Sequence, residues 1–126
     1  MGFDVVKTAD LEWEEREDGR KMAVLSDRAN MTNSRARFWR YPAHSKGRRH
    51  LDPDQEEVFV PIQGTLTMML GEPPARFDIG PGEVGIVHLG TPMQLFNDTD
   101  DDVLFFAYGA PTDHGNAEFL DDAELV

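Results

Sequence analysis

Short stretches in which apolar and polar residues alternate follow one another along most of this 126-residue chain. Alternation with a period of two is typical of a β-strand that buries one face. Glycine, proline and aspartate separate the stretches, and no amphipathic helix of ordinary length competes with them. The predicted strands are residues 22–25, 35–41, 58–62, 65–70, 76–79, 84–88, 93–97 and 103–108. Short strands at this spacing predict an all-β fold, either an antiparallel sandwich or a barrel.

The two ends of the chain differ from its middle. Residues 1–34 begin polar and irregular, and they are expected to form an N-terminal arm and first strands that pack on a barrel. The barrel itself is expected over residues 35–110. Residues 111–126 form an acidic tail that Phe119 and Leu120 could anchor, and a short helix or a disordered end are both open for it. A single domain is enough for this length.

The candidate chemistry lies in residues 50–64, HLDPDQEEVFVPIQG. Strand alternation places Glu57 and Phe59 on one face, and His50 and Asp52 also share a face. The turn around Pro53 lies between the two groups, so strict alternation need not continue across it. A segment that directs an imidazole and two carboxylates at one space could hold a cation, or it could orient a small polar ligand inside a barrel.

These residues resemble the first motif of the cupins. That motif runs His-x-His, three or four residues, Glu, six residues, Gly. Here His50, Glu57 and Gly64 reproduce the spacing, with Asp52 in the position of the second histidine.

The segment GPGEVGIVHLGTPMQLFN resembles the second cupin motif. Gly82, Gly90 and Asn97 fit that motif, whereas His88 stands where it has a proline and Met93 where it has a histidine. The resemblance covers about residues 35–110. It implies a single-domain cupin, a double-stranded β-helix or jelly-roll barrel, with degenerate metal-binding motifs.

The resemblance also implies a set of metal ligands. His50, Asp52 and Glu57 would bind Fe(II), Mn(II), Ni(II) or Zn(II) with water in the open positions. His88, near the end of its strand, could contribute a further ligand. Without a metal, His50 and Glu57 could instead act as the acid and base of an isomerase, lyase or cyclase.

Other residues of the predicted barrel would line a ligand pocket. Methionine and phenylalanine would supply an apolar wall that adapts to an irregular ligand, although plain barrel core is the better explanation for them. Asn97 could face the ligand or hydrogen-bond a turn. The predicted pocket residues are Phe59, Met93, Leu95, Asn97, Arg48 and Arg49.

Charge narrows the choice of ligand. The net charge of −12 argues against nucleic acid, because phosphate binding needs a basic surface. Six of the twelve basic residues nevertheless lie within residues 35–49, which contain no acidic residue. They are either solvated positions or a positive rim that favours a carboxylate or phosphate. The six are Arg35, Arg37, Arg40, Lys46, Arg48 and Arg49.

Two functions of different classes therefore fit the sequence. The first is a binding module that senses or carries a small molecule, an anionic one if the arginines line the mouth. The alternative is a small-molecule enzyme of isomerase, lyase or dioxygenase type, either metal-dependent or using acid–base groups. The fold does not choose between them.

The remaining features concern location and assembly. No apolar run reaches the roughly 18 residues that a membrane span requires, and the acidic N-terminus does not resemble a signal peptide. The absence of cysteine excludes disulfides and thiolate sites and is neutral about compartment. The cytoplasm is the default expectation. Aromatic residues on both faces of residues 35–41, with the polar arm, predict a homodimer that covers an exposed sheet.

Overall fold

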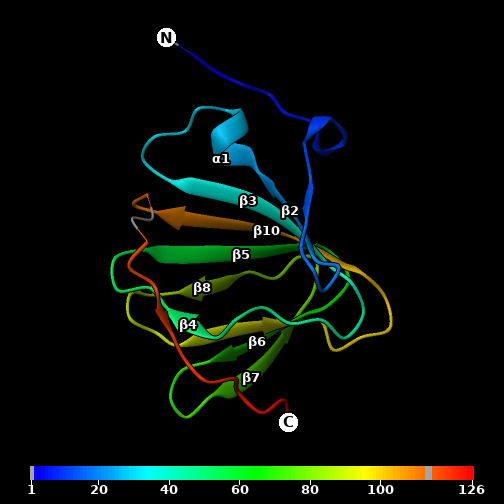
Figure 1. The fold of residues 1–126 in the computed structure, drawn as a ribbon, viewed down its shortest axis with the longest axis vertical. Helices are drawn as coiled ribbons and strands as arrows, with labels where there is room; N and C mark the ends of the chain where they lie inside the picture. Colours follow the sequence, from blue (N-terminus) through cyan, green and yellow to red (C-terminus); the bar gives the residue numbers. More distant parts are fainter. Residues whose placement is uncertain (1, 113–114) are drawn as a thin grey trace.

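The computed structural model describes residues 2–112 and 115–126, which form two antiparallel β-sheets (Figure 1). Sheet A has the strand order β1-β2-β3-β10-β5-β8, and sheet B has the order β11-β4-β9-β6-β7. The strands of sheet A are β1 (Glu14–Glu15), β2 (Lys21–Val24), β3 (Arg35–Tyr41), β10 (Val103–Ala110), β5 (Glu56–Gln63) and β8 (Gly85–Val87). Those of sheet B are β11 (Glu118–Phe119), β4 (His50–Leu51), β9 (Met93–Phe96), β6 (Leu66–Leu70) and β7 (Ala75–Ile79). The all-β prediction is confirmed.

The core lies between the two sheets, where their inward faces meet. Phe105 of β10 and Phe59 of β5 come from sheet A, and Leu66 and Met68 of β6 come from sheet B; all four are buried. Strand β5 shows the alternation that the sequence predicts, because Glu57, Phe59 and Pro61 are buried while Glu56 is exposed. The inward row of β5 therefore begins with a carboxylate and continues into the core.

Two helical turns interrupt the sheets, a 3-10 turn (Thr8–Asp10) and the helix α1 (Leu25–Arg28). The strand predicted over residues 22–25 ends at Val24, and α1 begins at Leu25. Helix α1 has only four residues, too few to show a helical period. It packs on the outer face of β3, where the Ser26 hydroxyl donates to the Ala36 carbonyl at 3.5 Å. Neither helical segment is long and apolar enough to cross a membrane.

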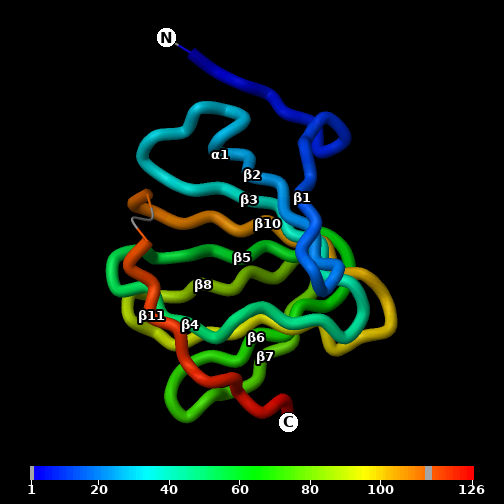
Figure 2. The backbone as a smooth tube through the Cα atoms, in the orientation of Figure 1, coloured from blue at the N-terminus to red at the C-terminus, as the bar shows by residue number. Residues whose placement is uncertain are grey.

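The two ends of the chain follow different paths. Residues at the N-terminus extend away from the sheets before β1 and β2 join sheet A (Figure 2). The tail runs across sheet B, where β11 pairs with β4 and the Leu120 amide donates to the Arg49 carbonyl at 2.9 Å. For residues 115–126, the alternatives of a short helix and a disordered end are therefore wrong.

A buried glutamine explains why the tail is ordered. The side chain of Gln94 is fully buried, and its Oε1 accepts a hydrogen bond from the Ala123 amide at 2.8 Å. Its Nε2 donates to Asp122 and to the Gly47 carbonyl. Because the tail pairs with a buried amide, releasing it would leave that amide unsatisfied.

Candidate metal and ligand site

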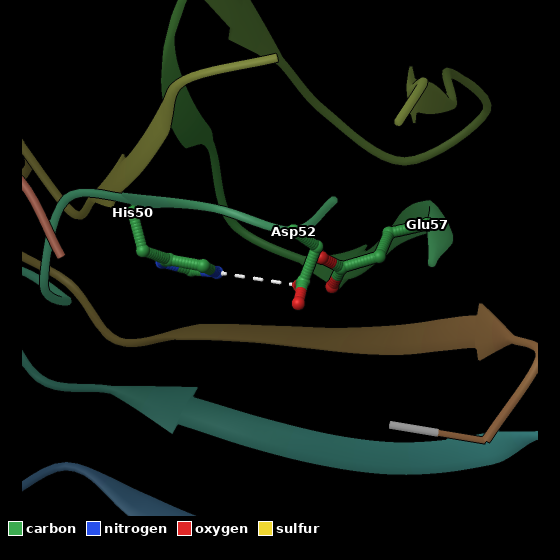
Figure 3. A group of neighbouring side chains, drawn as sticks. All are labelled: His50, Asp52 and Glu57. Atoms are coloured by element: carbon green, nitrogen blue, oxygen red, sulfur yellow. Dashed lines mark ion pairs between the residues drawn. The ribbon is translucent and has the colours of Figure 1, made fainter. Parts of the chain in front are cut away.

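Three predicted ligands converge at the start of β5. One ligand atom each from His50, Asp52 and Glu57 can be chosen so that all three lie within 4.8 Å of one another (Figure 3). His50 stands on β4, Asp52 follows it, and Glu57 begins the inward row of β5. The turn around Pro53 reverses the chain between them, so a segment of eight residues supplies the whole group.

The hydrogen bond of His50 indicates the tautomer of its neutral ring. Nδ1 lies 2.9 Å from the backbone carbonyl of Arg48, and a carbonyl can only accept, so Nδ1 carries the proton. In the neutral imidazole, Nε2 then presents a lone pair toward Asp52, whose Oδ2 is 3.8 Å away (Figure 3). An imidazole held by a backbone carbonyl in this way is typical of a metal-ligating histidine.

Glu57 is the most deeply placed of the three, with 3% of its surface exposed. A buried carboxylate requires compensating charge or hydrogen bonds. Arg37 of β3 contributes to this, because its Nη2 lies 3.7 Å from Glu57 Oε2. The site therefore combines an acidic group with a neighbouring arginine across sheet A.

The group opens into a cavity of about 400 Å³ between the sheets. Phe59, Met93 and Leu95 form part of its wall, at three positions that the sequence analysis assigned to a pocket. Arg48, another of those positions, also lines it. A cavity of this size matches the range of small-molecule sites.

Three predicted site residues lie elsewhere. His88 is exposed after β8 and is not a member of the His–Asp–Glu group. Arg49 is buried away from the cavity, where it donates to Glu72 at 2.8 Å and to backbone carbonyls. Asn97 is also buried outside the cavity, and its amide donates to the Tyr41 carbonyl at 2.9 Å. Asn97 therefore holds a turn, the second of the two roles that the sequence left open.

The arginine-rich segment lines the mouth only in part. Arg37 and Arg48 face the cavity, whereas Arg40 lies 3.8 Å from Asp102 and Lys46 pairs with Asp122. Neighbouring residues of an extended segment point to opposite sides, which explains why the Arg48 side chain lines the cavity and the Arg49 side chain does not.

Several further residues that line the cavity were not predicted from the sequence. Arg16 and Arg20 come from the β1–β2 turn, and Ala117 and Phe119 come from the tail. These segments show no periodicity that could have placed them at a site. Trp39 could have been predicted, because it shares one face of residues 35–41 with Arg37, and both residues line the cavity.

Arg20 and Tyr41 form a polar pair on the wall near the β1–β2 turn. Burial alone would lower the pKa of Arg20, but Tyr41 and Asp18 outweigh it and hold that pKa above its ordinary value. Burial raises the pKa of Tyr41, so its hydroxyl is neutral at physiological pH. This part of the wall is a fixed cation beside a neutral hydroxyl.

The chemistry of the donor set fits a divalent transition metal. One imidazole nitrogen and two carboxylates within a few ångströms form the three-ligand arrangement that Fe(II), Mn(II), Ni(II) or Zn(II) accept with positions left for water or ligand. Met93, which pairs with His50 in the β4–β9 register, offers only a thioether and suits these metals poorly. The residues therefore provide three ligands and leave the remaining positions open.

No protein-family model matches the chain, and no curated protein matches it significantly in sequence. Solved structures do match, and they place it in one class: the chain has the cupin fold, a double-stranded β-helix, as its motif resemblance predicted. A sugar phosphate isomerase of the cupin superfamily from Silicibacter pomeroyi has a TM-score of 0.79 and 18% identity, covering 98% of this chain and 97% of that one. The polyketide cyclase RemF from Streptomyces resistomycificus has a TM-score of 0.80 and 15% identity, covering 98% and 89%. KdgF from Halomonas sp. has a TM-score of 0.77 and 14% identity, covering 90% and 97%. At these identities the likeness establishes the fold alone.

Proposed function

We propose that this protein binds a small anionic molecule in the cavity, beside a divalent metal held by His50, Asp52 and Glu57. The observation that carries the proposal is the hydrogen bond from His50 Nδ1 to the Arg48 carbonyl. In the neutral imidazole this bond leaves Nε2 as an acceptor beside two carboxylates, an arrangement that a cation would complete. The matching solved structures support a small-molecule role, because their names include a sugar phosphate isomerase and a polyketide cyclase.

The charge around the cavity supports an anionic ligand. Among the residues that the structure describes, four arginines line it and two carboxylates do so, Asp52 and Glu57. A divalent metal would balance those two carboxylates, so the positive field of the arginines would remain for the ligand. A metal bound there would act as a Lewis acid toward ligand oxygen atoms. Phe59 and Met93 would meet the apolar part of the ligand and exclude water from it.

The alternative is an enzyme in which His50 and Glu57 exchange protons with a substrate. It uses the same residues, and no separate contact in the described part of the chain favours it. Binding of a ligand next to a metal is therefore the function that the site supports best.

Metal analysis of protein purified without chelator or affinity tag tests the proposal. We expect about one equivalent of a divalent transition metal, and we expect His50→Ala or Glu57→Gln to lower its affinity by more than about a hundredfold, beyond the loss typical of an outer-shell contact. Glu56→Gln is the matched control, because Glu56 is adjacent, exposed and on the opposite face of β5. If Glu56→Gln loses the metal while Glu57→Gln keeps it, the site is misassigned.

A further inference from the structure

The four arginines of the cavity differ in how their charge is balanced. Arg37 lies 3.7 Å from Glu57, and Arg20 donates to Asp18 at 2.7 Å. Arg16 and Arg48 have no carboxylate within 4 Å among residues 2–112 and 115–126. Both are exposed, so the uncompensated positive charge lies at the mouth rather than in the interior.

An aromatic ring backs each of these two guanidinium groups. The Cζ of Arg16 is 5.8 Å from the centroid of Trp39, and the Cζ of Arg48 is 3.7 Å from that of Phe119. Stacking on a ring restrains a guanidinium while its N–H edge stays available for a carboxylate or phosphate. Both arginines are thus positioned for an anion without already holding one.

The two rings belong to opposite walls of the cavity. Trp39 stands on β3 of sheet A, whereas Phe119 stands on β11 of sheet B. The β1–β2 turn holds Arg16 through the bond from its amide to the Arg20 carbonyl at 2.7 Å. The pairing of β11 with β4 holds Phe119 beside Arg48. Cations on two facing walls favour a ligand with an anionic group at each side.

We propose that Arg16 and Arg48 are two anion subsites of one cavity, and that its ligand is a small dianion, either a dicarboxylate or a phosphorylated carboxylate. This inference rests on the proposed function, because it places that ligand beside His50, Asp52 and Glu57. Neither cupin motif contributes to the subsites. The β1–β2 turn, β3, the residues before β4 and the tail build them.

Titration with glutarate and with its monomethyl ester tests the proposal. We expect glutarate to raise the melting temperature of the wild-type protein at millimolar concentration and to bind about tenfold more tightly than the ester, since a charge-assisted hydrogen bond is lost with the second carboxylate. Arg16→Gln and Arg48→Gln should each weaken glutarate binding about tenfold and should reduce the difference in affinity between glutarate and the ester. Added salt should weaken glutarate binding more than ester binding.

The control is Arg28→Gln, which changes the net charge equally at an exposed arginine outside the cavity. If Arg28→Gln loses as much glutarate affinity, the proposal of two subsites is overturned, because the change in net charge alone would then explain the loss. Equal affinity for diacid and ester, or no response of the wild type to glutarate, would also overturn them.

Metal content measured on the same variants separates this inference from the proposed function. If the metal binds but Arg16→Gln and Arg48→Gln keep full glutarate affinity, the dianion subsites are wrong and the metal site stands. If no metal binds but both variants lose glutarate, the metal site is wrong and the subsites stand.

Discussion

Replacing Asn97 with alanine should destabilise the protein without affecting its metal. Asn97 is 1% exposed, and its amide nitrogen donates to the carbonyls of Tyr41 at 2.9 Å and Asp101 at 2.7 Å. Its Oδ1 accepts from the amide and hydroxyl of Thr99 at 3.0 and 2.7 Å. The side chain therefore joins the end of β3 to the turn before β10 and does not face the cavity.

The magnitude follows from how well water can replace each lost bond. The Tyr41 carbonyl receives its bond in a buried setting, so losing the donor there costs about 1–3 kcal/mol. The bonds to Asp101 and from Thr99 are part-buried, and each contributes about 0.5–1 kcal/mol. The total is about 3 kcal/mol. For 126 residues the entropy of unfolding is about 0.26 kcal/mol/K, so the melting temperature should fall by about 11 °C.

Urea denaturation and calorimetry of Asn97→Ala and Asn97→Asp measure this effect. The aspartate has nearly the same shape but no donor, so its carboxylate would face carbonyl oxygens and should cost at least as much as alanine. Asn116→Ala is the matched control, because Asn116 is exposed and should change stability by less than about 0.5 kcal/mol. A loss below about 1 kcal/mol in Asn97→Ala, or a loss of metal with unchanged stability, would refute the structural role.

Two further predictions concern assembly and acid stability. Ile86 is 57% exposed on the edge strand β8 and forms an apolar outer surface of sheet A with Ile62 and Tyr108. We therefore expect a homodimer that Ile86→Asp converts to monomers. Light scattering that returns the 14.2 kDa monomer mass for the wild type across the micromolar range would contradict this prediction. A hydrogen bond from Lys46 lowers the pKa of Asp122 below its ordinary value, so this contact stabilises the tail above about pH 4 and the contribution is lost as the pH falls through the lowered pKa. Urea denaturation should therefore show a smaller loss of stability on acidification for Asp122→Asn than for the wild type, and an equal loss would contradict this.

Local patterns predicted the strands and the proximity of His50, Asp52 and Glu57 for the same reason. A half-buried strand requires apolar and polar residues to alternate in its own sequence, so β3 was predicted at its observed bounds. His50, Asp52 and Glu57 lie within eight residues, and one turn is enough to bring them together. Alternation placed Glu57 and Phe59 on one face, and in the structure both are buried while Glu56 is exposed.

The rest of the cavity depends on contacts between distant parts of the chain. Arg16 and Phe119 are separated by most of the sequence and lie in segments without a repeating pattern, so only the folded chain brings them to one mouth. The composition of the arginine-rich segment suggested a positive rim, but it did not reveal which side chains point into the cavity. Arg48 stacks on Phe119, whereas the adjacent Arg49 turns to Glu72. Composition can indicate a charged rim, but tertiary pairing decides which residues form it.

Met93, which stands where the second cupin motif has a histidine, explains why the proposed metal ligands all come from the first motif. Met93 stands opposite His50 in the β4–β9 register and is buried in the core, where a thioether packs well and an imidazole would need a polar partner. Met93 therefore serves packing, and three donors from the first motif remain. Two of them, Asp52 and Glu57, balance a divalent metal, so the metal would bring no surplus positive charge to its ligand. The selectivity for anions that we propose would then come from the arginines, which is why the proposed subsites at the mouth and the proposed metal site can be tested separately.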